Sequence, residues 1–431
     1  MNPTKIHRTL LEAINLTSRS AGGSHSIEEA EFPVIIRFSG ARSLDDISVM
    51  GFGDGLRIER RIDMMSAMAG TATRAEIERL SESDAVEIIW YDEPVYALLD
   101  SSVPLINVPS VWQSGNEGAG VRICIVDTGI DDGHPDLRGR VAAAQDFTTE
   151  GPRDRHGHGT HIASVAAGSG AASEGRYRGV APQATLLAAK VLRGDGTGRI
   201  SFVMAGLEWA IEQGAHVINL SLGSRGSCDG TDAISVTCDA AVDAGAVVVV
   251  AVGNDGPGSG TVGAPGCARK VITIGAISDE GVVADFSSRG PTLDGRVKPD
   301  IVLPGVSITA ARAGDTSLGI PMNESYTTEQ GSSMAAPHAA GVAALMLAAN
   351  PALVPAELKR IMMSATISLG VDQNMQGQGR LMAARAVELA RGETPAPTPD
   401  PTPSPIPEPV PPPTPEPDGC FAPVVRQFRR K

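Results

Sequence analysis

The chain reads GSSMAAPH at residues 331–338, a turn of small residues that leads directly into an apolar helical segment at 339–349. A serine at this place lies at a helix N-terminus, where unpaired backbone N–H groups favour nearby negative charge. Two upstream segments carry its potential partners, VDTG at 126–129 and HGHGTH at 156–161. Together the three segments supply a serine hydroxyl, an imidazole and a carboxylate, the groups that acyl transfer requires.

The composition is typical of a soluble globular protein with two or three folded units, since the chain has 431 residues and 42% hydrophobic content. The net charge of −14 argues against nucleic acid and anionic membrane surfaces as main partners, because those require a clustered basic face. No run reaches the roughly 18 consecutive apolar residues that span a bilayer. We therefore expect no membrane span.

The two ends of the chain give opposite indications of the compartment. Residues 392–418 are dominated by proline and predict a stiff, solvated linker without a core, followed by a short basic tail at 419–431. Such a tail favours an extracellular or cell-surface role. The first thirty residues contain no continuous apolar segment of the kind that a signal peptide requires, which favours the cytoplasm unless a leader is missing.

Residues 31–99 are predicted to form a small α+β unit after a polar N-terminal arm at 1–30. Thr73 and Glu76 match a capping box that opens a helix. Strands of this unit are expected at 33–38 and 86–91.

Residues 100–391 are predicted to form a doubly wound α/β domain, a mostly parallel sheet with helices on both faces. The reason is that β-rich apolar runs alternate with helical patterns along this part of the chain. Phe202, Ala205 and Trp209 recur at helical spacing, and we expect them to form the buried face of one helix. The predicted strands lie at 121–126, 185–191, 216–221, 246–252 and 271–275.

Asp127 stands at the end of one predicted strand, where open α/β sheets form their ligand crevices. Taken alone, it is also an ordinary residue of an Asp-Thr-Gly turn. The three histidines at 156, 158 and 161 could form a metal cluster or contain a catalytic base. The zinc-protease pattern of two histidines flanking a glutamate is absent, but the segment by itself leaves both interpretations open.

In combination, Asp127, His158 and Ser333 resemble the subtilisin-like serine proteases, or subtilases, of peptidase family S8, over residues 100 to about 391. Their order argues against an α/β-hydrolase, whose serine precedes its acid and base. The resemblance implies that Ser333 is the nucleophile, His158 the general base and Asp127 the carboxylate that orients the imidazole. It further implies that His161 is structural and His156 a solvated loop residue, and that the chemistry needs no cofactor.

The resemblance extends to the oxyanion hole. Asn254 follows a predicted buried strand, as the oxyanion asparagine of the family does. Its side-chain amide would act together with the backbone N–H of Ser333. The alternative is that Asn254 is only a turn residue of the Gly-Asn-Asp-Gly segment.

Substrate-binding residues are implied on several short segments. Gly263 leaves space for a large apolar side chain at the floor of the specificity pocket, while Asp255 near the rim would also admit a basic one. The edge that pairs with an extended peptide would contribute Ser221, Leu222 and Gly223, and Gly253 is counted with these residues.

Five cysteines are too few for a disulfide framework. Cys228, Cys238 and Cys267 are candidates for one bridge, and the resemblance favours Cys228 with Cys267, on two segments around the specificity pocket. We assign no metal ligand. Asp136 matches a family position that often binds calcium, but residues 168–178 depart from the family pattern, so the resemblance allows a structural calcium ion without requiring one.

The small unit at 31–99 looks like the propeptide of the family, an intramolecular inhibitor and chaperone whose C-terminal tail occupies the active-site cleft. Comparison with the family's mature N-terminus suggests self-cleavage between Leu99 and Asp100, within a few residues. The alternative is an ordinary accessory domain.

The sequence thus predicts a serine endopeptidase, a hydrolase made as a self-processing zymogen, which cleaves peptide or protein substrates through an acyl-enzyme. We expect broad specificity with a preference for a large apolar P1 residue. One alternative is a peptide ligase or macrocyclase with the same triad, in which an amine intercepts the acyl-enzyme. Another is a catalytically silent subtilase fold that binds extended peptides.

Overall fold

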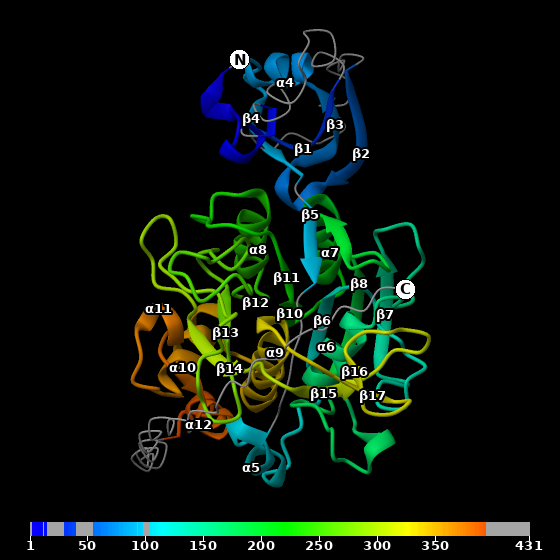
Figure 1. Cartoon of the computed structure of the whole chain (residues 1–431), viewed down its shortest axis with the longest axis vertical. Coiled ribbons are helices and arrows are strands. Elements are labelled where there is room, and N and C mark those ends of the chain that lie inside the picture. Colours follow the sequence, from blue (N-terminus) through cyan, green and yellow to red (C-terminus); the bar gives the residue numbers. More distant parts are fainter. Residues whose placement is uncertain are drawn as a thin grey trace, which may run out of the picture. The chain divides into compact units, whose positions relative to one another are not determined.

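A nine-stranded sheet organises the larger part of the protein (Figure 1). Its order is β18-β19-β14-β13-β12-β10-β6-β8-β7, and every neighbouring pair is parallel except β18 with β19. The computed structural model describes residues 2–11, 13–14, 30–39, 55–92, 94–97 and 104–393. The strands of this sheet are β6 (Arg122–Asp127), β7 (Val141–Asp146), β8 (Thr185–Lys190), β10 (Val217–Leu220), β12 (Val247–Ala251), β13 (Ile272–Ile277), β14 (Ile301–Pro304), β18 (Thr366–Ile367) and β19 (Arg380–Leu381).

The five predicted apolar runs form β6, β8, β10, β12 and β13, which are neighbours or near neighbours in the sheet. They are mostly apolar because both faces of the sheet are covered. In β6, Ile123 and Ile125 belong to the core on one face, whereas Cys124 and Val126 belong to the core on the other. The predicted doubly wound α/β fold is confirmed.

Helices α6 and α9 pack on the first of these faces, and α7 and α8 pack on the second. In Figure 1 the yellow α9 lies beside the strands near the middle of the sheet. It is the one described helix that is long and apolar enough to cross a membrane, and 89% of it is buried within the fold, as for a core helix. The helices of this part are α5 (Val108–Gln113), α6 (His158–Ala167), α7 (Ile200–Glu212), α8 (Ala233–Asp243), α9 (Ser332–Ala349), α10 (Pro355–Ser364), α11 (Gln373–Gln376) and α12 (Ala383–Ala390), with short 3-10 turns η3 (Pro104–Ile106) and η4 (Ala171–Ser173).

The predicted buried face of α7 is wrong in part. Ala205 is buried, but Phe202 and Trp209 are only half-buried. Val203 and Leu207 are fully buried and face the sheet. The two large aromatic side chains lie at the margin of this core, where Trp209 meets Phe147 edge to face. The spacing is helical, as expected, but Phe202 and Trp209 lie at the edge of the buried face and not at its centre.

A second, antiparallel sheet has the order β2-β3-β1-β4. The predicted helix begins at the predicted cap, because Thr73 Oγ1 accepts a hydrogen bond from the Glu76 N–H at 3.3 Å. The predicted strands are also confirmed. The elements are β1 (Glu31–Phe38), β2 (Leu56–Ile62), η2 (Asp63–Met65), β3 (Ala67–Thr73), α4 (Arg74–Ser81) and β4 (Val86–Tyr91).

The N-terminal arm is not simply polar, which corrects the prediction for residues 2–14. Ile6, Leu10 and Ile14 are buried against β1 and β4, and Ile6 forms a bridge to Ile89. After the short turn η1 (Pro3–Lys5), the described residues from 8 to 14 are helical. Leu10 and Ile14 are four positions apart, so they lie on one face of this helix, and together with Ile6 before it they fold onto the small sheet.

Three sequence predictions fall outside the described residues: the processing site at Leu99 and Asp100, the proline-rich linker after residue 393, and the basic tail.

Candidate active site

The three predicted catalytic residues lie at the carboxyl end of the central strands. Asp127 is the last residue of β6, His158 the first of α6 and Ser333 the second of α9, and all three are fully buried. Leu220 pairs with Val126, which puts Ser221 next to Asp127 in the neighbouring strand. Ser333 is hydrogen-bonded to Ser221, so residues more than 200 positions apart in the chain share one site.

Asp127 and His158 form a buried hydrogen-bonded pair. His158 Nδ1 lies 2.7 Å from Asp127 Oδ1, which also accepts the Thr128 N–H at 2.7 Å. A carboxylate can only accept here, so Nδ1 carries a proton, and Nε2 is the ring nitrogen that can act as a base. Asp127 Oδ2 is buried without a hydrogen-bond partner among the described residues.

Asp154 connects the aspartate and histidine segments, and the sequence analysis missed it. The residue is buried, with 1% of its surface exposed. Oδ1 accepts from Thr128 Oγ1 (2.9 Å), His156 N (3.0 Å) and Gly157 N (2.8 Å), while Oδ2 accepts from the backbone (2.9 Å) and hydroxyl (2.6 Å) of Thr160. An aspartate just before a helix entry commonly satisfies first-turn N–H groups, and that signal was present in the sequence.

Ser333 and Ser221 exchange hydrogen bonds. Ser333 Oγ donates to the Ser221 carbonyl at 3.1 Å, and Ser221 Oγ donates to the Ser333 carbonyl at 2.6 Å. Asn219 Nδ2 donates to Ser221 Oγ at 3.0 Å. In this structure the Ser333 hydroxyl is therefore hydrogen-bonded to Ser221, which follows β10. Rotation about the Cα–Cβ bond of Ser333 would turn its hydroxyl away from Ser221.

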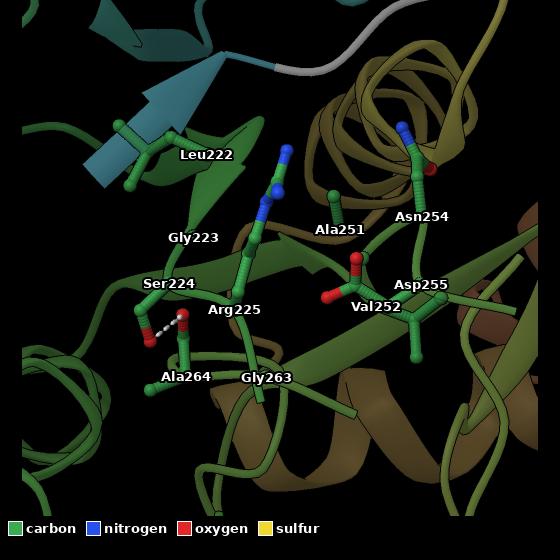
Figure 2. Close-up of a pocket in the computed structure, with 11 residues that line it drawn as sticks. Leu222, Gly223, Ser224, Arg225, Ala251, Val252, Asn254, Asp255, Gly263 and Ala264 are labelled. Atoms are coloured by element: carbon green, nitrogen blue, oxygen red, sulfur yellow. Dashed lines mark hydrogen bonds between the residues drawn. The ribbon is translucent and has the colours of Figure 1, made fainter. Parts of the chain in front are cut away.

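Asn254 lies immediately after β12 and faces the start of α9 (Figure 2). Its Oδ1 accepts the Ser332 N–H at 2.8 Å, and Ser332 Oγ accepts the Gly253 N–H at 3.1 Å. Because the side-chain oxygen is occupied, the Nδ2 protons of the Asn254 amide remain to serve as donors. The residue predicted for the oxyanion hole thus lies against the residue that precedes Ser333.

The predicted peptide-binding edge is paired with a strand of the same chain. β5 (Pro94–Ala97) lies between β11 (Leu222–Gly223) and β9 (Thr197–Arg199) in a three-stranded antiparallel sheet. Ala97 pairs with Leu222, and Tyr96 pairs with Gly223 on one side and Thr197 on the other. An extended backbone is therefore held on both edges at this site.

A cavity of about 360 Å³ opens beside β11 and contains the predicted residues Gly253, Asp255 and Gly263 in its lining. Arg225, which the sequence analysis did not name, extends along it (Figure 2). At Gly263 an added Cβ would approach the Ser224 carbonyl oxygen to 2.1 Å, so only glycine fits this part of the wall. The full lining is Leu222, Gly223, Ser224, Arg225, Ala251, Val252, Gly253, Asn254, Asp255, Gly263 and Ala264.

Two further histidines flank the site. His156, predicted to be solvated, is instead half-buried, with its ring 6.3 Å from that of His158 and its Nε2 against Gly196; burial lowers its pKa. His161 is fully buried and its Nε2 lies 3.2 Å from the Ile308 carbonyl. Burial lowers the pKa of His161 to about 3, so this ring is neutral and structural.

Cys228 and Cys267 are joined by a disulfide, with their Cα atoms 5.9 Å apart. Cys228 follows the segment after β11, and Cys267 follows the glycine-containing wall of the cavity. The competing Cys238 is a buried free thiol in α8, and Cys124 is a buried free thiol in β6. The bridge thus links the two segments that flank the cavity.

The surroundings of Asp136 do not fit a calcium ion. Its Oδ1 accepts the Ala172 N–H at 2.9 Å, and its Oδ2 accepts the Tyr326 hydroxyl at 2.8 Å. The nearby segment 168–178 adds one carboxylate, the exposed Glu174, and two arginines. Calcium prefers six to eight oxygen ligands, several of them carboxylates. Here both oxygens of Asp136 are already engaged by neutral donors.

A parallel α/β sheet with a carboxylate, an imidazole and a serine hydroxyl at one end has the architecture of a serine hydrolase. Residues 118–381 match the model of the Subtilase family. Serine protease AprX of Bacillus subtilis (strain 168) is 36% identical over 359 residues, covering 77% of this chain and 81% of the relative. Subtilisin J of Geobacillus stearothermophilus is 32% identical over 388 residues, covering 86% and 96%. An intracellular serine protease of Paenibacillus polymyxa is 34% identical over 303 residues, covering 67% and 86%.

The chain therefore belongs to the subtilase family, the subtilisin-like serine proteases of peptidase family S8, and is a hydrolase.

Proposed function

We propose that this protein is a serine endopeptidase that cleaves peptide bonds through an acyl-enzyme on Ser333. The observation that carries the proposal is the fully buried 2.7 Å contact between Asp127 and His158, next to a serine at the N-terminus of α9. Such a pair fixes the tautomer and orientation that a general base needs.

In the first half of the reaction, Ser333 Oγ exchanges its hydrogen bond to Ser221 for one to His158 Nε2. The oxygen attacks the substrate carbonyl carbon while Nε2 takes its proton, and Asp127 stabilises the imidazolium. The developing oxyanion accepts hydrogen bonds from Asn254 Nδ2 and the Ser333 N–H. His158 then returns the proton to the leaving amine as the C–N bond breaks.

In the second half, water takes the place of the amine. His158 Nε2 removes one proton from the water, whose oxygen attacks the acyl carbon, and the tetrahedral intermediate again lies at Asn254. Collapse breaks the bond to Ser333 Oγ, which recovers its proton from His158.

Substrate peptides bind as a strand between β9 and β11, the position that β5 occupies. Main-chain pairing of this kind depends little on side chains, which supports broad specificity. The cavity beside β11 takes the P1 side chain, and its apolar walls together with the space at Gly263 favour a large apolar residue. Asp255 and Arg225 also line this cavity, and we expect them to contact polar groups of the substrate.

The small unit that ends in β5 is a propeptide, and the protein is made as a zymogen. β5 fills the peptide-binding edge, and Ile35, Ile62 and Trp90 share one apolar core with α7 and α8. Asp92 accepts hydrogen bonds from the backbone (2.7 Å) and the hydroxyl of Ser201 at the start of α7. Such contacts would hold the unit in place until the chain is cut near Leu99 and Asp100.

A fluorophosphonate probe tests the nucleophile. We expect the mature protein to gain the mass of one phosphonyl group at Ser333, and Ser333→Ala to gain none. Ser332→Ala is the matched control, since this neighbouring serine should leave labelling in place. Equal labelling of wild type and Ser333→Ala, or no labelling of the wild type, would overturn the assignment and support a silent peptide-binding role.

Intact mass after expression tests the zymogen. Wild type should convert to a fragment that begins near Asp100, and Ser333→Ala should stay full-length. Full-length wild type together with strong labelling by the probe would leave the endopeptidase in place and remove the propeptide from the proposal.

A further inference from the structure

A small antiparallel sheet leads into the nucleophile and carries a carboxyl group that the mechanism above does not use. Its strands are β15 (Ile308–Ala311), β17 (Tyr326–Glu329) and β16 (Ile320–Pro321), in the order β15-β17-β16. Glu329 ends β17, four residues before Ser333. It pairs with Ile308, whose carbonyl contacts His161 on the same helix as His158. The strand and the helix are thus fixed relative to each other.

The Glu329 side chain is enclosed in a space made by a glycine. The residue is 8% exposed, and its Oε1 is buried without a hydrogen-bond partner among the described residues. An added Cβ at Gly319 would come within 2.0 Å of this oxygen. Gly319 also has a φ of +73°, which disfavours other residues. The backbone next to β16 therefore makes room for the carboxyl group and holds it inside the protein.

Among the charged groups around Glu329, His158 is the one that acts on it electrostatically. Burial raises the pKa of Glu329 to about 7, and the imidazole of His158 opposes that rise. His161 is neutral, as shown by its lowered pKa. The other titratable or charged groups on the surrounding elements include His134, which contacts Ser325, and Asp131, which accepts the Gly314 N–H. They also include His338 of α9, Asp136 bound to Tyr326, Arg312 after β15, Asp315 paired with Arg153, and exposed Glu324 in the hairpin.

We propose that Glu329 is a positioning residue that acts on catalysis through His158, as a second carboxylate that stabilises the imidazolium form. The inference rests on the proposed role of His158 as general base. A buried carboxylate is screened little by salt, so it favours the positive charge that His158 acquires when it takes the Ser333 proton. A change in the charge of Glu329 therefore changes how well the imidazolium is stabilised, and this couples the rate to the charge of Glu329.

Glu329→Gln keeps the shape of the side chain and removes its charge. Without the carboxylate, His158 loses its proton more readily. We therefore expect the acid limb of kcat/KM to move to lower pH by about 0.5–1 unit, which is within the range that one neighbouring charge produces. The imidazolium of the transition state is also less stabilised, so the plateau at high pH should fall by about 3–10-fold. Glu324→Gln, exposed in the same hairpin, should change neither.

The measurement is kcat/KM for a chromogenic peptide between pH 5 and 10. A plateau that falls while the acid limb stays in place would mean that Glu329 only shapes the site, and it would overturn the inference. So would an acid limb that moves to higher pH. His158→Ala separates the two levels of the argument: if it retains proteolysis, the proposed mechanism fails, whereas an inactive His158→Ala with an unmoved limb in Glu329→Gln sinks this inference alone.

Thermal unfolding in the Ser333→Ala background gives a second readout that needs no activity. A carboxyl whose pKa is raised in the folded protein contributes stability at low pH and loses it as pH rises through about 7. Wild-type Glu329 should therefore lower the Tm between about pH 4.5 and 7, and Glu329→Gln should lack that loss. Equal slopes in both proteins would show that the carboxyl is not held as described, against the inference.

Discussion

The side-chain oxygen of Asn254 accepts the backbone N–H of Ser332 at 2.8 Å, which leaves the amide nitrogen of Asn254 as the donor for the proposed oxyanion hole. Asn254→Ala removes this donor and should lower kcat by about 10²–10³, with little change in KM. That magnitude was measured on a subtilisin, a member of the same family. Steady-state kinetics on one peptide substrate decide the matter, and an equal loss in a Ser332→Ala control would point to disturbed packing.

Asp154 should matter for stability and activity together, because its buried carboxylate accepts five hydrogen bonds that tie the segment of Asp127 to that of His158. Asp154→Asn presents an NH₂ group to surrounding donors. We expect a loss of about 2–4 kcal/mol in the free energy of unfolding. In the folded fraction kcat should fall with KM largely kept. Asp132→Asn, on an exposed position nearby, should be neutral; a stable and fully active Asp154→Asn would contradict the assigned role.

Asp92 should make the docking of the small unit pH-dependent. Burial raises its pKa from the usual 3.8 to about 6, which corresponds to about 3 kcal/mol. A raised pKa means that stability is present at low pH and is lost as pH rises from about 4 to 6. In full-length Ser333→Ala the Tm should fall as pH rises through this range. In the double variant that also carries Asp92→Asn, the Tm should depend less on pH. An unchanged slope would assign the effect to other groups.

Asp136 should depend on the Tyr326 hydroxyl as its partner, and not on a metal ion. Tyr326→Phe leaves Asp136 Oδ2 without its 2.8 Å donor and should cost about 1–3 kcal/mol of stability. Because no ion is expected at this site, neither adding calcium nor removing it with EDTA should change the Tm of the wild type. If calcium stabilises the wild type but not Asp136→Asn, an ion binds at Asp136 after all.

Local sequence patterns were sufficient for the central strands of the large sheet and for the start of one helix. Continuous apolar runs predicted the parallel strands because a sheet covered on both faces needs no polar alternation, and Thr73 with Glu76 marked a helix start because the cap is made within one turn. The same local reading missed Ile6, Leu10 and Ile14, whose burial depends on a sheet formed by later residues. It also misplaced the centre of the buried face of α7, where the large aromatic residues lie at the margin of the core.

For the candidate site, the sequence by itself determined which chemical groups are present, since Asp127, His158, Ser333 and Asn254 each stand in a short motif with its own glycines. Only the tertiary structure decided how those groups are held: the Asp154 carboxylate between two motifs, the hydrogen bond from Ser333 to Ser221, and Glu329 in the space left by Gly319. The physical reason is range. A motif records the conformation of a few neighbouring residues, whereas burial and hydrogen-bond partners are set by segments that only the folded sheet brings together.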